Sequence, residues 1–556
     1  MSPNVPIDEL SRATDLRVCP ASVSEAGGAT YFVGRRGDEK VAGCLGSPCL
    51  PDAKRTGDLG GRCVCVGPLS AANAVFVRKA LPWTAPRCLG LATSAGFGDR
   101  LGLSTPGHVR AVRGTGIAPV FAQQSIREMT RTARTPQDVI DAATWGVLQE
   151  GFRDGFGADA DHLQKPEYLD PTAAAGFTMF TIDPGEHVRS DAGRLGSAEL
   201  DAAFEAVARE ALESSGADLK RRYAGKRFPL DGGSHIEMAE ADLGRAAVKY
   251  GAAVGHTVRM YRRLADIAGA GAPRGEGVPP LRPEGILPSC FSGSLKRAPE
   301  EKQHTEEARG RDARETQGRD PYGQAALATP GPFELEVSVD ETDSPTSPAE
   351  HYFIAAELRR LGVRWVSLAP RFPGRFEKGI EYIGDLEEFR RSFAQHVAVM
   401  RTLGPYKISI HSGSDKFNLY PIIAELCGGM VHLKTAGTTY VEALRAVATA
   451  APDLFRRILS FARSCYDKDR ASYLVSAEAD RVPDVSSIRD ADLPPLLDEP
   501  NVRQVLHVTF GSVLTAGGGE RFRAPILQAL SRHEETFYAL LAGHIGRHLR
   551  AFRIDK

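Results

Sequence analysis

Residues 406–440 carry the pattern that most restricts how this chain can fold. Residues 407–410 are β-prone, residues 417–427 place apolar side chains at helical spacing, two glycines end that helix, and residues 430–433 are β-prone again. A strand-helix-strand unit of this length is right-handed and makes its two strands parallel. The pattern therefore predicts an α/β protein with a parallel sheet.

Two histidines lie at the carboxyl ends of these predicted strands, His411 on the first and His432 on the second. In parallel α/β proteins this edge carries the functional sites, because the loops vary while the sheet holds them in place.

Strand-like segments recur along the chain, and most are followed by a helical pattern such as the one that Pro136 opens and that runs to about Glu150. A TIM-like (β/α)8 barrel is the fold that this alternation favours. A ninth strand-like segment, residues 88–92, leaves the register open. The eight predicted strands are 117–122, 156–161, 177–182, 333–339, 364–369, 407–411, 430–433 and 504–509.

Changes in amino-acid composition and in apolar periodicity divide the chain into four parts. Residues 1–85 are Gly-rich with short β-like pieces and predict a small N-terminal β-containing region. Residues 86–270 hold the first part of the barrel, and residues 332–556 hold the second part and a helical C-terminal extension. Between them, residues 271–331 are rich in Pro, Gly, Arg and Glu without an apolar period, which predicts a flexible insertion.

Composition restricts the partners and the compartment. A net charge of −1 over 556 residues gives no electrostatic case for nucleic acid or an anionic membrane, and favours a small-molecule partner. No apolar run reaches the roughly 18 residues of a membrane span, and the first residues lack a basic and apolar signal, so we expect a cytoplasmic protein. The oligomeric state stays open, and a homo-oligomer is compatible with the sequence.

The cysteines favour reduced thiols. Their number, nine, is odd, and they are spread through a large chain, which does not fit a disulfide framework. Cys63 and Cys65 form a C-x-C pair in a strand-like run, but this pair lacks zinc-finger spacing, so we do not expect a metal site there.

If the barrel forms, the strand ends bring three imidazoles together with carboxylates. His162, His411 and His432, with Glu336, predict a site for a divalent ion such as Zn²⁺, Mn²⁺, Co²⁺ or Ni²⁺, which nitrogen and oxygen ligands bind. The alternatives are ordinary hydrogen-bonding loop histidines and, for Glu336, a polar strand face turned away from the core.

Asp161 precedes His162 and points differently in an extended strand, so Asp161 is a candidate acid/base, and Glu336 is a second catalytic candidate. Two histidines on the last helix, His544 and His548, have a spacing that permits a metal, but a structural role is favoured. The residues that could hold a polar, anionic substrate are Gln123, Gln124, Arg127, Ser412, Asp415 and Lys434.

At these residues the sequence resembles the tagaturonate epimerase family, whose members interconvert D-tagaturonate and D-fructuronate in hexuronate (galacturonate/glucuronate) catabolism. The resemblance covers most of residues 88–265 and 333–550. It rests on the segments GDRLGLSTPGHVRAV, APVFAQQSIREMTRTARTPQDVIDAA, GFGADADHLQ, AGFTMFTIDP, KISIHSGSDKFNLYPII, VHLKTAGTTYVEALR and HVTFGSVL.

A second likeness is to metal-dependent class II aldolases. Their Asp-His pair at a strand end is similar to Asp161–His162, and their His-Gly-Gly-Ser-Gly turn is similar to residues 411–414, although Ser412 and Asp415 replace glycines.

Together the likenesses imply a metal-dependent epimerase that breaks and remakes a carbon–carbon bond. The carbon to be inverted lies β to the ketone, so its C–H is not acidified, whereas retro-aldol cleavage and re-addition can invert it. Asp161 would remove the hydroxyl proton. The alternatives are a class II-type aldolase that releases the aldehyde, and a non-catalytic sugar-acid or metal-binding protein. Transient oxidation by a nicotinamide is disfavoured because the chain lacks a dinucleotide-binding glycine motif.

Overall fold

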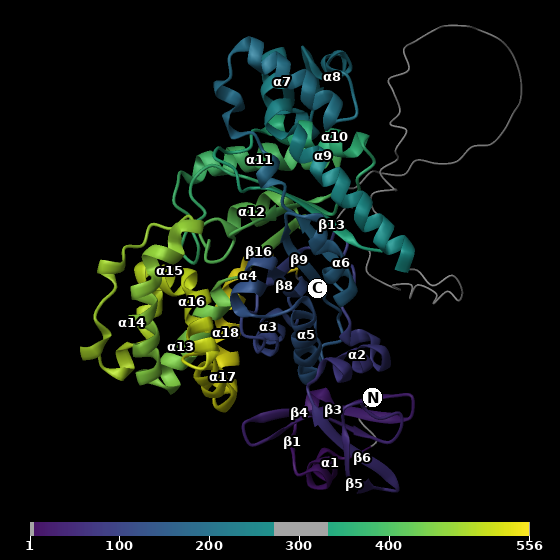
Figure 1. Ribbon diagram of the computed structural model, residues 1–556, viewed down its shortest axis with the longest axis vertical. Coiled ribbons are helices and arrows are strands. Elements are labelled where there is room, and N and C mark those ends of the chain that lie inside the picture. Colours follow the sequence, from purple (N-terminus) through teal and green to yellow (C-terminus); the bar gives the residue numbers. More distant parts are fainter. Residues whose placement is uncertain (1–4, 272–331, 555–556) are drawn as a thin grey trace, which may run out of the picture.

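A closed barrel of eight parallel strands forms the centre of the computed structural model, which describes residues 5–271 and 332–554 (Figure 1). The strands follow one another around the barrel in chain order, and the last pairs with the first, so the predicted TIM-like fold is confirmed. They are β7 (Ser94–Phe97), β8 (Ala118–Ser125), β9 (Gly157–Leu163), β10 (Met179–Ile182), β13 (Glu334–Val339), β14 (Ser367–Pro370), β15 (Lys407–Ile410) and β16 (Val431–Thr435).

Helices connect these strands on the outside of the barrel. Helix α5 shows how the sequence sets their ends: the Thr135 hydroxyl accepts from the N–H of Asp138, whose carboxylate accepts from the N–H of Thr135, and Gly151 ends the helix at a φ of 58°. The predicted helix from Pro136 to Glu150 is thus confirmed. The connecting helices are α3 (Thr105–Val112), α4 (Ile126–Thr132), α5 (Pro136–Glu150), α6 (Leu169–Ala175), α10 (Pro348–Arg360), α11 (Leu386–Leu403), α12 (Tyr420–Cys427) and α13 (Thr438–Ala450).

Two of the predicted strand positions are wrong. Residues 504–509 fall in helix α15 (Pro500–Val508) and just after it, where Val502, Val505 and Leu506 are buried at helical spacing. The strand that completes the barrel is β7, the first barrel strand along the chain. The ninth strand-like segment, 88–92, is itself not a strand, and β7 begins two residues after it ends. Short apolar, β-branched runs fit both periods, and here tertiary packing decides between them.

The N-terminal β-containing region is an antiparallel sheet at one end of the molecule (Figure 1). Helix α2 (Ala71–Ala80) leads from it toward the barrel, and its buried residues pack with Trp145 and Leu148 of α5. The division of the chain at residues 85 and 86 stays a prediction. The remaining elements of this region are α1 (Ile7–Thr14), β1 (Arg17–Val18), β2 (Ser24–Ala26), β3 (Ala29–Arg36), β4 (Glu39–Leu45), β5 (Lys54–Leu59) and β6 (Arg62–Pro68).

A helical layer projects from the opposite end of the molecule (Figure 1). Along the chain it is inserted between β10 and β13. It contains α7 (Ser197–Glu210), α8 (Gly216–Tyr223), the hairpin β11 (Lys226–Pro229) and β12 (His235–Met238), and α9 (Glu240–Gly271). The predicted flexible insertion at 271–331 lies, apart from its first residue, outside the described residues.

The helical C-terminal extension is also confirmed. Its last helix, α18 (Glu534–Leu549), packs on both α3 and α13. These two helices follow β7 and β16, the strands whose pairing closes the barrel. The other helices of the extension are α14 (Pro452–Asp469), α15, α16 (Phe510–Thr515) and α17 (Arg523–Arg532).

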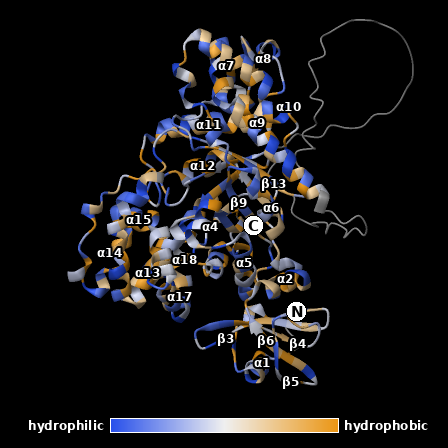
Figure 2. Cartoon of the chain, in the orientation of Figure 1, coloured by the Kyte–Doolittle hydropathy of each residue, from blue (hydrophilic) through white to orange (hydrophobic). Residues whose placement is uncertain are grey.

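The helices around the barrel carry both hydrophilic and hydrophobic residues, as amphipathic helices that cover a barrel do (Figure 2). Among residues 5–271 and 332–554, no helix combines the length and the apolar character that crossing a bilayer requires.

Candidate active site

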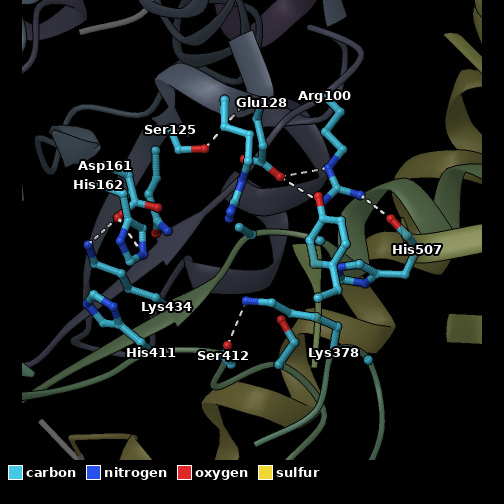
Figure 3. A pocket seen from close by; sticks show the side chains of 17 residues that line it. Arg100, Ser125, Glu128, Asp161, His162, Lys378, His411, Ser412, Lys434 and His507 are labelled. Atoms are coloured by element: carbon cyan, nitrogen blue, oxygen red, sulfur yellow. Dashed lines mark hydrogen bonds and ion pairs between the residues drawn. The ribbon is translucent and has the colours of Figure 1, made fainter. Parts of the chain in front are cut away.

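A polar pocket opens at the carboxyl ends of the barrel strands (Figure 3). It brings together side chains from four strand ends, the loop after β14 and helix α15. Among the residues that line it are Gln123, Ser125, Arg127, Asp161, His162, Lys378, His411, Ser412, Lys434 and His507.

Strand β9 supplies two neighbouring pocket residues, Asp161 and His162. In a regular strand, successive side chains point to opposite faces. His162 instead has a φ of 51°, in the left-handed region that non-glycine residues seldom adopt, and the pairing of β9 with β10 shifts register there. Both side chains therefore reach the pocket, with Nε2 of His162 3.8 Å from Oδ1 of Asp161. The predicted difference in direction between Asp161 and His162 assumed an extended strand, and the backbone at His162 departs from that conformation.

Lys434, on β16, is a buried cation of the site. Its Nζ lies 2.8 Å from Oδ2 of Asp159, 2.7 Å from Oδ1 of Asp161 and 2.7 Å from Oε1 of Glu336. Burial disfavours the ammonium, but the three carboxylates outweigh it and hold the pKa of Lys434 well above its usual value. Because Nζ also contacts the hydroxyl of Thr181, its donors are already engaged within the protein, which weakens the prediction that Lys434 contacts substrate.

Asp161 is ionised at neutral pH for the same reason. Burial works to raise the pKa of its carboxyl group, but Lys434 and the two neighbouring imidazoles hold that pKa below its usual range. The pocket therefore presents a carboxylate that can accept a proton.

His411 joins two carboxylates from β13 and the residue after it. Its Nε2 is 2.6 Å from Oε1 of Glu336, and its Nδ1 is 3.0 Å from Oδ1 of Asp340. Burial opposes the charged ring, yet Asp340 and Glu336 raise the pKa of His411 to about 9.

His162 is oriented from behind by Asp183, whose Oδ2 lies 3.3 Å from Nδ1 of the ring. Gln164 and the N–H of Gly185 hold that carboxylate in place. Although burial opposes protonation, Asp161 and Asp183 raise the pKa of His162 to about 10. A carboxylate on one ring nitrogen leaves the other facing the site, as in many histidines that bind metals.

These contacts create a group of donors with the chemistry of a metal centre. One ligand atom each of His162, His411 and Asp340 lies within 4.8 Å of the others, and the two imidazole rings are 5.0 Å apart. Two imidazoles and one carboxylate suit Zn²⁺, Mn²⁺, Co²⁺ or Ni²⁺. The surrounding carboxylates raise the pKa of both imidazoles. The same negative charges would stabilise a divalent ion bound in place of the two protons. The residues therefore fit a metal.

His432 lies deeper in the barrel, fully buried, with Nδ1 2.9 Å from the hydroxyl of Ser94. Within the described part of the chain its Nε2 has no hydrogen-bond partner, and burial lowers the pKa of the ring to about 3, so the ring is neutral. Glu336 is also fully buried and is engaged by His411, Lys434 and Ser367. The roles of His432 and Glu336 as ligands stay predictions, and Asp340 is the carboxylate with an oxygen within 4.8 Å of a ring nitrogen of both His162 and His411.

The opposite side of the pocket is suited to an anionic, hydroxylated ligand. Arg127 and Lys378 both line it and also line an adjoining cavity, together with Ser412. The ammonium of Lys378 is 2.6 Å from the hydroxyl of Ser412. Gln123 reaches the pocket, and neither polar atom of its amide has a hydrogen-bond partner among the described residues. The amide has this space because residue 96 is a glycine, whose missing Cβ would otherwise collide with it.

Two predicted substrate residues do not line this pocket. Gln124 follows Gln123 on strand β8, so it faces the helix layer, where its Oε1 accepts from Arg134 at 3.1 Å. Asp415 points away, into a network behind the pocket wall.

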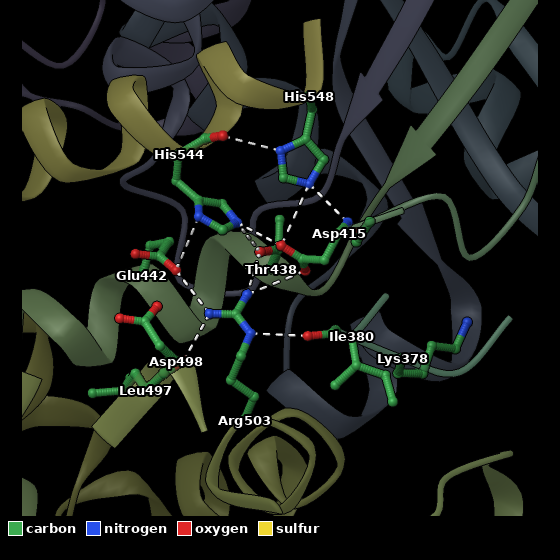
Figure 4. A network of polar contacts seen from close by, with 12 residues as sticks. Lys378, Ile380, Asp415, Thr438, Glu442, Leu497, Asp498, Arg503, His544 and His548 are labelled. Carbon is green, nitrogen blue, oxygen red and sulfur yellow. Dashed lines mark hydrogen bonds and ion pairs between the residues drawn. The ribbon is translucent and has the colours of Figure 1, made fainter. Parts of the chain in front are cut away.

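Figure 4 shows this network: His544 and His548 point toward Asp415, and Arg503 bridges Asp415 and Glu442. The N–H of Asp415 donates to Nε2 of His548, and Nδ1 of His548 lies 3.0 Å from the carbonyl of His544. Arg503 pairs with both carboxylates and Arg445 also pairs with Glu442, while the histidine pair joins the last helix to the loop after β15, which fits the favoured structural role. One ligand atom each of Asp415, His544 and His548 also lies within 4.8 Å of the others, so the metal alternative stays open.

Three residues of the site were not among the predicted site residues: Asp159, Asp340 and Lys378. The sequence identifies their positions to different degrees. Asp159 sits two positions before Asp161, so strand alternation alone places both on one face. Asp340 ends an acidic strand, but nothing local identifies which of its acids turns inward. Lys378 lies in the loop between β14 and α11, whose sequence has no period, so only tertiary structure reveals it.

Comparison with known proteins agrees with this fold and shows the family. The family model described as tagaturonate epimerase matches residues 19–270 and 320–552. The tagaturonate/fructuronate epimerase of Thermotoga maritima is 41% identical over 477 residues, which cover 86% of this chain and 84% of that protein. Crystal structures of the fructuronate-tagaturonate epimerase UxaE of Cohnella laeviribosi superpose well: a glycerol complex has a TM-score of 0.81 at 33% identity, with 98% of each chain covered. The native crystal structure has a TM-score of 0.80 with the same identity and coverage. The chain therefore belongs to the tagaturonate epimerase family and is an isomerase, a carbohydrate epimerase.

Proposed function

We propose that this protein interconverts D-tagaturonate and D-fructuronate in the barrel pocket, as a divalent-metal-dependent enzyme of hexuronate catabolism in the cytoplasm. The observation that carries the metal requirement is the convergence of His162, His411 and Asp340 within 4.8 Å beside the ionised Asp161. The substrate pair comes from the relatives, whose names specify the same two sugar acids.

His162, His411 and Asp340 would hold the ion, with Glu336 and His432 within the same buried cluster. When bound, such an ion supplies a Lewis acid that polarises the ketone of the substrate and lowers the cost of negative charge on its oxygen. Asp183 contributes by fixing the His162 ring, so that the nitrogen facing the pocket is available.

The reaction requires inversion at a carbon that bears a hydroxyl group and lies β to the ketone. Asp161 accepts the proton of that hydroxyl, the C3–C4 bond opens, and its electrons move onto the ketone oxygen. The aldehyde half rotates, C3–C4 re-forms on the other face of the aldehyde, and Asp161 returns the proton. Lys434 supports this role because it keeps Asp161 ionised between turnovers.

The carboxylate of the sugar acid belongs on the opposite side, near Arg127 and Lys378, which line both the pocket and the adjoining cavity. Gln123 supplies an amide with no internal partner, which can bind a substrate hydroxyl. A substrate held at both ends keeps the aldehyde fragment in the pocket during its rotation.

Proton NMR of D-tagaturonate with metal-loaded and chelator-treated protein tests the proposal. We expect fructuronate only in the metal-loaded sample. His411→Ala should lose both metal binding and turnover, whereas His235→Ala, which changes an exposed histidine of β12, should keep both. A metal-replete, active H411A variant would refute this ligand set, and no conversion in any sample would refute the proposed reaction.

The same experiment in D₂O tests the bond that breaks. Retro-aldol cleavage keeps every carbon-bound hydrogen, so epimerised product should carry no deuterium at C3 or C4. Deuterium at the inverted carbon would show proton abstraction instead and would overturn the cleavage step.

A further inference from the structure

Four cysteines gather on one face of the N-terminal sheet, far along the chain from every barrel residue described above. Cys44 lies on β4 directly opposite Cys65 on β6, and Cys63 shares the face of Cys65 because it is two residues earlier on the same strand. Cys49 follows the turn that leaves β4.

The turn that carries Cys49 is held over the sheet by two hydrogen bonds. The N–H of Gly46 donates to the carbonyl of Cys63 at 2.8 Å, and the hydroxyl of Tyr31 donates to the carbonyl of Pro48 at 2.8 Å. The backbone therefore fixes Cys49 above the strand pair.

The sulfur atoms are as close as those of a metal centre. Sγ atoms of Cys44, Cys49 and Cys65 all lie within 4.8 Å of one another, and Sγ of Cys63 is 3.5 Å from that of Cys65. A tetrahedral zinc site with Zn–S bonds of about 2.3 Å separates its sulfurs by roughly 3.8 Å. Cys44 and Cys49, now 2.6 Å apart, would move apart by about one ångström, which small side-chain rotations allow.

We propose that Cys44, Cys49 and Cys65 bind a structural zinc ion, with Cys63 as the fourth ligand. Thiolates are soft donors, and four of them favour zinc over the hard ions that suit carboxylates. The C-x4-C half formed by Cys44 and Cys49 has the spacing of zinc sites, but the C-x-C half formed by Cys63 and Cys65 does not, and only the pairing of β4 with β6 brings the two halves together.

The proposed ligands lie where the N-terminal sheet meets the barrel. Cys44 and Cys65 are buried in the small core that also contains residues of helices α2 and α5. An ion there would fasten the sheet at the place where it meets the barrel.

Cobalt titration of the full-length chain under reducing conditions tests the proposal. Cobalt bound by thiolates gives an intense sulfur-to-cobalt charge-transfer band, which the nitrogen and oxygen donors of the barrel site do not produce. We expect the band in the wild type, its displacement by Zn²⁺, and its loss in Cys65→Ser and in the partly exposed Cys49→Ser. Cys465→Ser, on helix α14, is the matched control and should keep the band.

The absence of the band in the wild-type protein would overturn the proposal, as would its persistence in both C49S and C65S. A disulfide between Cys44 and Cys49 that persists under the reducing conditions of the titration, seen as an intact mass two hydrogens lower, would also overturn the proposal. C49S serves as the second variant if C65S fails to fold, since Cys49 lies nearer the surface.

Discussion

Replacing Lys434 by Met tests the electrostatic core of the site. The change keeps the length of the side chain and removes the ammonium from Asp159, Asp161 and Glu336, each within 2.8 Å. The Lys434 side chain is 4% exposed, and those of Asp159 and Glu336 are fully buried. Removing one partner of a buried ion pair costs about 3–5 kcal/mol, so we expect K434M to lower the free energy of unfolding by about that amount near pH 7.

The loss should shrink as the pH falls. Without the ammonium, the carboxylates take up protons in the folded state above their unfolded pKa values, so the folded variant binds more protons than the unfolded chain and gains stability toward pH 5. In the wild type, burial is outweighed by Lys434, which holds the pKa of Asp161 and that of Glu336 below the usual values, so these two groups give no such gain.

Urea unfolding of chelator-treated wild type and K434M between pH 5 and 8 measures the difference. A difference below about 1 kcal/mol at pH 7, or one that stays constant down to pH 5, would contradict this account of the charge cluster. Activity provides a second readout. Without Lys434 the pKa of Asp161 should rise, so less of this group is ionised at neutral pH and turnover should fall.

Further predictions concern the metal, the carboxylate contact and the packing of the rim. Metal binding at pH 8 should release about two protons, because His162 and His411 have pKa values of about 10 and about 9 before they bind; calorimetry in buffers of different ionisation enthalpy would contradict this if release stayed below one. Lys378→Met should raise KM for tagaturonate about tenfold or more and leave kcat within a few-fold, since a charged hydrogen bond contributes about 1.5–3 kcal/mol; an unchanged KM would exclude Lys378 from carboxylate binding. Gly98→Ala should destabilise the protein by about 1–3 kcal/mol, because its Cβ would lie 2.5 Å from a backbone carbonyl oxygen in the loop after β16. In the control variant Gly193→Ala, the new Cβ has no described atom within 4 Å, so its thermal unfolding should match that of the wild type.

Local patterns predict much of the barrel. The strand-helix-strand unit at 406–440 appears as β15, α12 and β16, because each element has a clear period and a glycine stop. The segment 504–509 fails because its apolar residues also satisfy a helical period, and the neighbouring helices, not the local sequence, select that period.

The site was predictable where a strand end alone decides position. His162, His411 and Asp161 all line the pocket at strand ends, as the strand-end rule predicts, although His162 and Asp161 face it together only through the φ of 51° at His162. Gln124 and Asp415 lie equally close in sequence but turn away, since a side chain's direction in a loop or strand depends on register and on backbone angles that single residues do not encode. Asp415, for example, has a φ of 61°.

The position of α18 has a consequence for biosynthesis. This helix packs on α3 and α13, which follow the two strands that close the barrel, β7 and β16, and His548 on it accepts a hydrogen bond from the backbone of the loop after β15. A ribosome releases the chain from its N-terminus, so α3 and α13 emerge about eighty residues or more before the helix that packs on them. The nascent barrel therefore lacks this cover until synthesis is nearly complete, and a message truncated before residue 534 would encode a chain that keeps all eight strands but leaves the surfaces of α3 and α13 beneath α18 exposed to chaperones and proteases.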